Sequence, residues 1–304
     1  MIEFLNALPG AAAQGIIWGI MAIGVYITYK ILDIADLTVD GSFGTGGATL
    51  VLCMTSGMGL PLSMLIAFLA GCLTGFATGV FHTKFGIPAI LAGILTQLGL
   101  YSVNLRILGG ANLTLSDRKY KLLVNLKNTY PSLLICTIFA VVIIAVLYWF
   151  FGTEMGHSLR ATGCNPAMAR ANGINTEKNK IIAIILSNGL VALSGALLAQ
   201  WQGFADVSMG RGAIVIGLAA VIIGEVIFGK IFKNFALRLA GVVMGGIVYY
   251  AVITFVLRLG LNANDLKLLS ALVVAVFLAI PYWKKTWSEN RRKPMEEGAK
   301  DAGN

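Results

Sequence analysis

Nine runs of predominantly apolar residues dominate the sequence and limit what it can fold into. A helix needs about 20 such residues to cross the hydrocarbon core of a bilayer. The runs lie at 11–29, 39–56, 61–81, 87–108, 131–151, 180–203, 212–229, 237–257 and 268–283. Only 12% of the residues are charged, against about 25% in a soluble domain. We therefore expect an all-α integral membrane protein with about nine transmembrane helices, in which the Gly-rich runs 39–56 and 212–229 are candidates for half-helices or re-entrant segments.

The basic residues predict how the chain is oriented in the cytoplasmic membrane. Cytoplasmic loops of membrane proteins carry an excess of Lys and Arg. Placing the C-terminus inside puts most of the 23 Lys and Arg residues on the cytoplasmic side, including those of the tail 284–304. The exception is the polar stretch 109–130, which carries basic residues on the predicted outside.

A short motif occurs twice and indicates an inverted internal repeat. Ala35-Asp-Leu-Thr-Val39 matches Ala205-Asp-Val-Ser-Met209, and a Gly-rich stretch follows each copy. Each copy has one predicted span before it and three after it, so the two copies fall on opposite sides of the membrane, as in many transporters. We expect one transmembrane domain over 1–304: repeat 1 at about 11–108, a linking span at 131–151, a cytoplasmic loop at 152–179, repeat 2 at about 180–283, and the tail 284–304.

Polar side chains close to apolar segments are the candidates for a solute pathway or gate, because such groups are unfavourable in lipid and face protein or water. The acids are Asp36, Asp40, Asp206 and Glu225, and the neutral residues are Thr38, Ser42, Gln97, Asn188, Gln200 and Ser208. A structural interpretation stands beside the functional one. Asp36 and Asp206 can cap the helices that follow them, and the neutral side chains can link helices by hydrogen bonds.

The predicted inside loop contains a short helix with clear ends. Asn165 can cap it, Pro166 suits its first position, and Asn172-Gly173 can end it. A helix of one and a half turns is not stable alone. We expect it either to pack on its own bundle or to dock onto a soluble subunit.

This loop resembles the coupling-helix signature of permeases of the branched-chain amino acid and ribose ATP-binding cassette (ABC) importers. The residues that match are Arg160, Ala161, Gly163, Asn165, Gly173 and Ile174, with Ala169 and Arg170 in register. The runs 36–42 and 210–224 are also similar to motifs of that family, and the resemblance covers about 15–283.

The resemblance implies a vitamin-B12-type (type II) importer fold and a set of partners. These are a second permease copy or a close relative, a cytoplasmic ATPase dimer that binds ATP and Mg²⁺, and an extracellular or lipid-anchored solute-binding protein. It implies that the ATPase is coupled through Arg160, Gly163, Asn165, Pro166, Ala169, Arg170 and Gly173. The run 36–42 resembles a branch assigned to tryptophan or tyrosine uptake.

The sequence also sets limits on other functions. It contains no Walker A motif, no metal-ligand spacing and no Ser-His-Asp arrangement. We therefore expect no catalytic residues, no metal and no cofactor in this chain. We also expect no nucleic-acid partner, because the sequence has no basic patch interleaved with aromatic residues. The alternative function is an ion-gradient-driven secondary transporter that uses Asp36, Asp40 and Asp206. A membrane-embedded enzyme is disfavoured, because the sequence lacks the paired acids, histidine cluster or nucleophile that catalysis would require.

Overall fold

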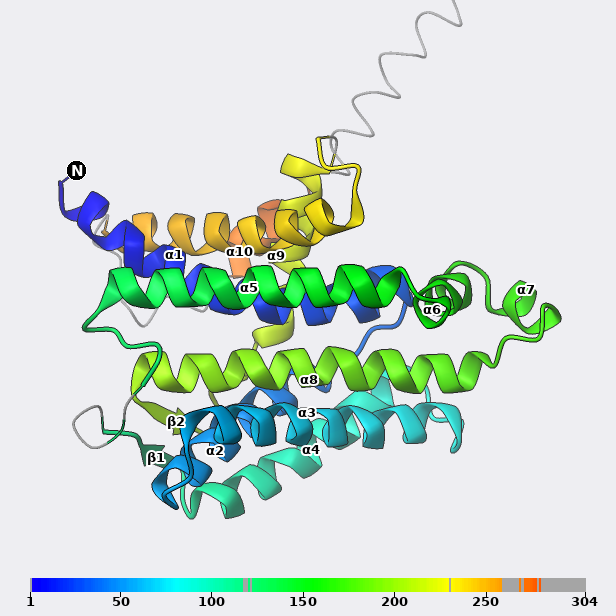
Figure 1. Cartoon of the computed structure of the whole chain (residues 1–304), viewed down its shortest axis with the longest axis horizontal. Coiled ribbons are helices and arrows are strands. Elements are labelled where there is room, and N and C mark those ends of the chain that lie inside the picture. Colours follow the sequence, from blue (N-terminus) through cyan, green and yellow to red (C-terminus); the bar gives the residue numbers. More distant parts are fainter. Residues whose placement is uncertain are drawn as a thin grey trace, which may run out of the picture.

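The computed structural model describes residues 2–116, 120, 122–229, 231–258, 268, 271–277 and 279. They form helices that lie mostly side by side along one direction (Figure 1). In chain order the helices are α1 (Ile2–Tyr26), α2 (Val39–Thr55), α3 (Leu60–Thr83), α4 (Ala89–Leu108), α5 (Thr129–Phe151), α6 (Glu154–Cys164), α7 (Pro166–Ala171), α8 (Thr176–Gln202), α9 (Ala213–Phe228) and α10 (Phe235–Arg258). A π-helical turn, η1 (Ile27–Ile31), extends α1.

Six helical segments of the described chain are long and apolar enough to cross a membrane: Ala7–Ile31, α3, α4, α5, α8 and the Phe235–Leu257 part of α10. By contrast, α2 has 17 residues and α9 has 16, fewer than the roughly 20 that a full span needs. These are the two runs that the sequence marked as half-helix candidates. Of the run 268–283, the structure describes residues 268, 271–277 and 279, all of them helical, and the tail 284–304 lies outside the described residues.

The burial of the helices separates a central pair from a peripheral layer. In the spanning windows of the segment Ala7–Ile31 and of α8, 83% and 72% of the residues are buried, against 22% for α5. Most exposed side chains of α5 are apolar, and they include Leu134, Ile138, Val142 and Val146. Because lipid tails are themselves apolar, such a face is stable against the bilayer.

The packing partners of the central helices form a matched pattern. α1 packs against α10, α8 packs against α3, and α1 and α8 contact each other. α1 and α8 run in opposite directions, as do α3 and α10 (Figure 1). α2 crosses α8 closely, because a Cβ atom on Gly46 would meet the backbone of Ala192 and one on Gly195 would meet the backbone of Phe43. Small residues at a crossing allow this approach.

The loop expected at 152–179 contains two helices instead of one, and α8 begins at Thr176 rather than at 180. The reason is local. The Thr153 side chain accepts the N–H of Gly156, and the Asn175 side chain accepts the N–H of Lys178. Because of these polar caps, each helix starts at a polar residue rather than at its first apolar residue.

Two short strands, β1 (Asn112–Thr114) and β2 (Phe204–Asp206), pair antiparallel at the end of the bundle opposite α7 (Figure 1). Asn112 lies opposite Asp206, and Leu113 lies opposite Ala205. The pairing attaches the polar stretch after α4 to the end of α8.

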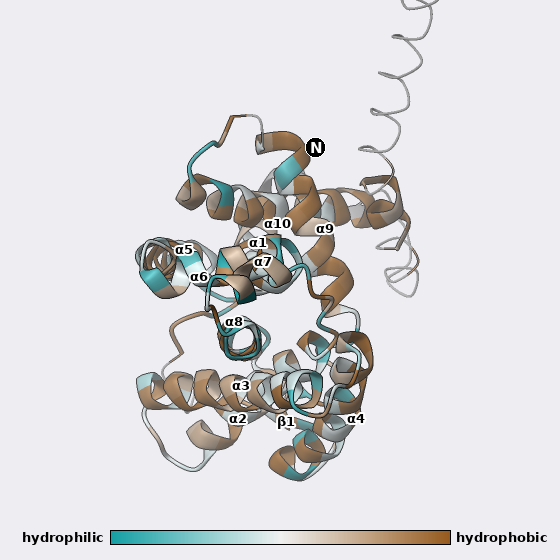
Figure 2. Cartoon of the chain, turned by 90° about the vertical axis from the view of Figure 1, so that its right-hand side faces the viewer, coloured by the Kyte–Doolittle hydropathy of each residue, from teal (hydrophilic) through white to brown (hydrophobic). Residues whose placement is uncertain are grey.

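Figure 2 looks onto the α6–α7 end of the bundle. Hydrophilic residues lie around α7 and the first turn of α8, whereas hydrophobic residues cover α4 and α9. The hydrophilic end and the hydrophobic sides are the arrangement expected of a multi-pass membrane protein whose α6–α7 end lies in water.

Candidate functional site

The helix α7 has the ends that its sequence predicts. The Asn165 side chain accepts the backbone N–H groups of Ala167 and Met168 at 3.1 and 3.0 Å, and Pro166 occupies the first turn. Gly173 adopts a φ of +79°, a conformation that glycine tolerates best. Its N–H donates to the carbonyl of Arg170 at 3.0 Å.

Most of the surface of α7 is uncovered. Ala169 is buried and faces the rest of the chain, while Ala167, Met168, Arg170 and Ala171 are exposed. Met168 is 64% exposed. In Figure 1, α7 lies beyond the ends of the long helices. A short helix with an open apolar and basic face is suited to docking against a separate protein.

The helix before α7 is fixed to the bundle by buried contacts. Asn179 of α8 is 4% exposed, and its amide donates to the hydroxyls of Ser158 and Thr162 at 2.6 and 2.8 Å. A Cβ atom on Gly163 would meet the carbonyl of Ile31, so α6 lies directly against η1. The helix α6 therefore joins α7 to η1 and α8 through close packing.

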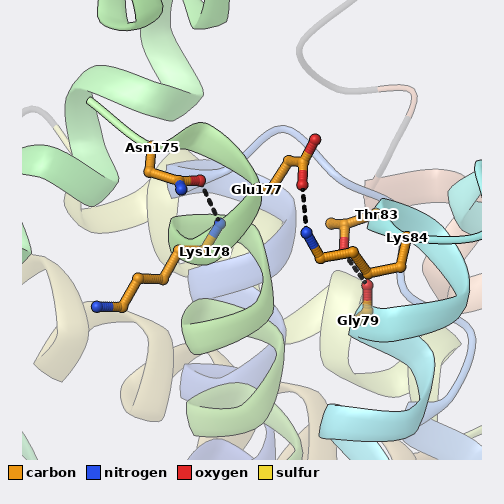
Figure 3. A network of polar contacts seen from close by, with 6 residues as sticks. All are labelled: Gly79, Thr83, Lys84, Asn175, Glu177 and Lys178. Carbon is orange, nitrogen blue, oxygen red and sulfur yellow. Dashed lines mark hydrogen bonds and ion pairs between the residues drawn. The ribbon is translucent and has the colours of Figure 1, made fainter. Parts of the chain in front are cut away.

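A surface network ties the start of α8 to the end of α3 (Figure 3). Asn175 caps α8 at 3.0 Å, Glu177 pairs with Lys84 at 2.9 Å, and the Thr83 hydroxyl donates to the carbonyl of Gly79 at 2.8 Å. Because both partners of the ion pair are exposed, it adds little stability. The Asn175 cap defines where α8 begins, and the pair positions Glu177 beside α3.

Arg160 does not lie with Arg170 on α7. Its guanidinium lies 4.4 Å from the ring centre of Phe235 and 5.4 Å from that of Phe151. Arg160 therefore contacts the bundle, whereas Arg170 lies on the exposed surface of α7. Their predicted roles in ATPase coupling remain predictions.

Several of the predicted pathway residues meet in a buried polar network. Asp36 is 3% exposed and accepts the N–H of Thr38 at 2.9 Å and the amide of Asn188 at 2.7 Å. The Asn188 oxygen accepts the hydroxyl of Ser42 at 2.6 Å. The Thr38 hydroxyl lies 2.7 Å from that of Thr78. The network joins the loop before α2 to α3 and α8.

The acids of the repeated motif do not cap the helices that follow them directly, contrary to the structural interpretation of the sequence. Asp36 and Asp206 each accept the N–H two residues later, from Thr38 and Ser208, at 2.9 and 2.6 Å. Both make local turns. Instead, Asp40 caps α9: its oxygens accept the N–H groups of Gly212 and Ile214, both at 2.9 Å.

A cavity of about 230 Å³ opens beside this cap. Its polar lining comes from Asp40, Gln97, Tyr101, Asn104 and Arg211. The Arg211 guanidinium lies 5.7 Å from the ring centre of Tyr101. Asn104 is 1% exposed, and its side-chain oxygen has no hydrogen-bond partner. The cavity thus offers a cation, a carboxylate, amides and an aromatic ring to a small polar molecule.

Sequence reasoning selected Asp40 and Gln97 but did not select Arg211, Tyr101 or Asn104. Arg211 carried a usable signal, because it is a cation between two glycines of the second motif, next to an apolar run. Asn104 is a neutral polar residue within the predicted span 87–108, for which hydrogen bonding between helices was the favoured interpretation. Tyr101, one turn away on α4, carried no comparable signal.

The remaining candidates lie elsewhere. Gln200 is fully buried, and its oxygen accepts the N–H of Leu123 at 3.4 Å. Glu225 pairs with Lys30 at 3.0 Å near the α6 end. The predicted pathway residues therefore form a buried network and a cavity, with Gln200 and Glu225 separate from both. The Asp206–Ser208 turn borders the cavity, because Val207 lines it.

The chain is similar to permease components of amino acid transport systems. The sequence model of a family described as "Branched-chain amino acid transport system / permease component" matches residues 8–281. The tyrosine transport system permease protein of Clostridioides difficile (strain R20291) is 39% identical over 275 residues, which cover 90% of this chain and 91% of that protein.

A more distant relative is the autoinducer 2 import system permease protein LsrC of Yersinia pseudotuberculosis serotype O:1b (strain IP 31758). It is 31% identical over 214 residues, which cover 68% of this chain and 58% of that protein. Among solved structures, a chain of a metal-chelate type ABC transporter in an inward-facing conformation superposes with a TM-score of 0.51. It is 17% identical, and the match covers 92% of this chain and 85% of that one. At this identity the likeness concerns the fold alone.

Proposed function

The chain belongs to the family of permease components of branched-chain amino acid transport systems, and on that premise we propose that it is the membrane subunit of an ABC importer for an amino acid, with aromatic amino acids as the favoured solutes. The observation that carries the proposal is α7, a capped six-residue helix with its outer face uncovered. The relative described as a tyrosine permease supports the choice of solute.

The proposed partners follow from the open face of α7. A cytoplasmic ATPase dimer binds ATP and Mg²⁺ and receives α7 of each permease copy. A second copy of this chain or a close relative completes the pathway, and an extracellular or lipid-anchored binding protein delivers the solute. ATP hydrolysis belongs to the ATPase, so this chain is not itself an enzyme.

The proposed architecture is a type II importer fold of about nine membrane helices with an inverted repeat, in which α2 and α9 are the two short helices. The pairing of α1 with α10 and of α8 with α3, in opposite directions, supports the repeat. The turns Asp36–Thr38 and Asp206–Ser208 have the same hydrogen bond. α5 then serves as the linking span between repeat 1 and repeat 2.

The proposed orientation puts the α6–α7 end in the cytoplasm and the β1–β2 end outside. Lys30 and Arg238 line a cavity beside α6, and Lys178 lies at the start of α8 with Lys84 beside it, in agreement with the excess of positive charge on cytoplasmic loops. The cytoplasmic C-terminus stays a prediction, because the tail lies outside the described residues.

The proposed contact point for the solute is the cavity beside Asp40. A free amino acid carries a carboxylate, which Arg211 can bind with two parallel hydrogen bonds, and an ammonium group, which suits Asp40. The ring of Tyr101 can stack against an aromatic side chain. The predicted pathway residues Asp40 and Gln97 line this cavity.

The test is ATP hydrolysis by the assembled complex in liposomes. Arg170→Glu reverses the charge on the open face of α7, and Gly173→Val places a β-branched residue at a φ of +79°. We expect both variants to assemble but to lose most of the permease-dependent stimulation of the ATPase. Arg106→Glu, an exposed change on α4, is the control. Unchanged stimulation in both α7 variants would refute the docking role.

A second candidate function, ion-gradient-driven transport, is favoured by one observation. Asp36 is almost fully buried, and within the described residues no Lys or Arg forms an ion pair with it. Buried acids of this kind carry protons in secondary transporters. Uptake into vesicles that continues without ATP and stops when the proton or sodium gradient is dissipated would favour this function over the first.

A further inference from the structure

A second and larger cavity lies at the α6 end of the bundle. Its volume is about 890 Å³, and it lies among η1, the end of α5, α6 and the start of α10. Four basic side chains line it: Lys30, Arg160, Lys233 and Arg238. The pathway and docking residues other than Arg160 take no part in it.

The positive charge of this cavity is largely uncompensated. In the described part of the chain the ion pairs are Lys30–Glu225 and Lys84–Glu177. Arg160, Lys233 and Arg238 therefore have no carboxylate partner there. Arg160 instead lies over aromatic rings, an arrangement that leaves guanidinium N–H groups free to bind an anion. The cavity thus suits a negatively charged ligand.

The cavity opens beside the last turn of α5, next to the exposed apolar face of that helix. Tyr148 and Trp149, 51% and 71% exposed, form its wall at the last turn of α5. They continue the exposed apolar face of Ile138, Val142 and Val146. Tyr and Trp collect at the depth of lipid headgroups, so the cavity opens at the boundary between the lipid-facing surface and water.

We propose that this cavity binds the phosphate headgroup of an anionic phospholipid. Basic pockets between membrane helices at the cytoplasmic side bind such headgroups. The phosphodiester would lie between Arg160, Lys233 and Arg238, with the acyl chains along the exposed face of α5. The placement in the cytoplasmic leaflet rests on the proposed function, whereas the phosphate site itself does not.

A lipid bound in this cavity would also affect the docking helix. Arg160 lies on α6, which packs on η1 and directly precedes α7. A bound headgroup would hold α6 against α10 and thus fix the base of the docking helix. Stimulation of the ATPase is then expected to depend on anionic lipid.

The test measures lipid retained by the purified full-length protein. We would add phosphatidylglycerol to the protein in detergent and determine bound lipid by native mass spectrometry. Lys233→Gln/Arg238→Gln should weaken retention about tenfold or more, as expected for the loss of charge-assisted hydrogen bonds. Lys84→Gln/Lys178→Gln removes the same charge at the same end of the bundle and should retain the lipid. Lys233→Arg/Arg238→Lys keeps the charge and should restore retention, which separates binding from misfolding.

Two further arms identify the source of the phosphate. Neither phosphatidylcholine, which has no net charge, nor inorganic phosphate at equal concentration should displace phosphatidylglycerol. Displacement by inorganic phosphate, or equal retention in the cavity variant and its control, would overturn the proposal. The readout needs neither ATP nor solute, so failure of the transport assignment would leave it interpretable.

Discussion

The carboxylate of Asp40, in the first turn of α2, accepts the backbone N–H of Gly212 at 2.9 Å, although 172 positions separate the two residues. The other carboxylate oxygen accepts the N–H of Ile214 at 2.9 Å. An acid at a helix N-terminus satisfies free N–H groups and suits the positive end of the helix dipole. The start of α9 is therefore fixed by a side chain from the first half of the chain.

Asp40→Ala should destabilise the protein by about 1–3 kcal/mol, because it leaves two backbone N–H groups without their acceptor. Asp40→Asn keeps one acceptor oxygen and should lose less. The measurement is thermal unfolding of the purified protein in detergent. Equal melting temperatures for the Ala variant and the unchanged protein would show that the cap contributes nothing.

Asn188 is expected to contribute to stability, because its amide donates a hydrogen bond to the buried carboxylate of Asp36. Asn188→Leu leaves Asp36 without its amide donor, which should destabilise the protein by about 1–3 kcal/mol. Asp36→Leu/Asn188→Leu replaces both partners by apolar groups of similar shape and should be less destabilised than the sum of the single variants. Additive losses in thermal unfolding would argue against a direct interaction.

The crossing of α2 and α8 should tolerate no added methyl group. Gly195→Ala places a Cβ atom against the backbone of Phe43 and should destabilise the protein by about 1–3 kcal/mol, as overpacking does. Gly99 on α4 has nothing within 4 Å of its virtual Cβ, so Gly99→Ala is the control and should unfold at an unchanged or higher temperature. If the two variants behave alike, the close crossing is not a source of stability.

Arg211 should bind the carboxylate of the solute. Arg211→Gln removes a charge-assisted hydrogen bond and should reduce amino acid uptake into proteoliposomes by about tenfold or more. Arg106→Gln changes an exposed arginine that does not line the cavity and should leave uptake unchanged. Full uptake by Arg211→Gln would remove the cavity from the pathway.

The sequence predicted the elements that local composition determines. The bounds of six helices agree with the predicted runs to within two residues, because the ends of a long apolar run mark the ends of its helix. These helices are α2, α3, α4, α5, α9 and α10. The cap at Asn165 and the turn at Gly173 are also local and are confirmed. α6 was missed, although Thr153-Glu154 is a typical helix start.

Contacts between distant segments could not be predicted. The pairing of Asn112 with Asp206 and the cap of Asp40 on α9 depend on which surfaces meet after the helices pack. The same holds for the cavity around Arg211. Its residues come from α2, α4 and the segment before α9, and no spacing along the chain relates them. The sequence also does not indicate that Asp36 accepts a hydrogen bond from Asn188 whereas Asp40 accepts one from Gly212.

The docking of α7 is tested most directly by cross-linking. A photoreactive residue at Met168, which is 64% exposed on α7, should link the permease to the cytoplasmic ATPase that purifies with it. The same probe at Leu73, 69% exposed on α3, should not. A transport-active complex in which position 168 never labels the ATPase would contradict the account.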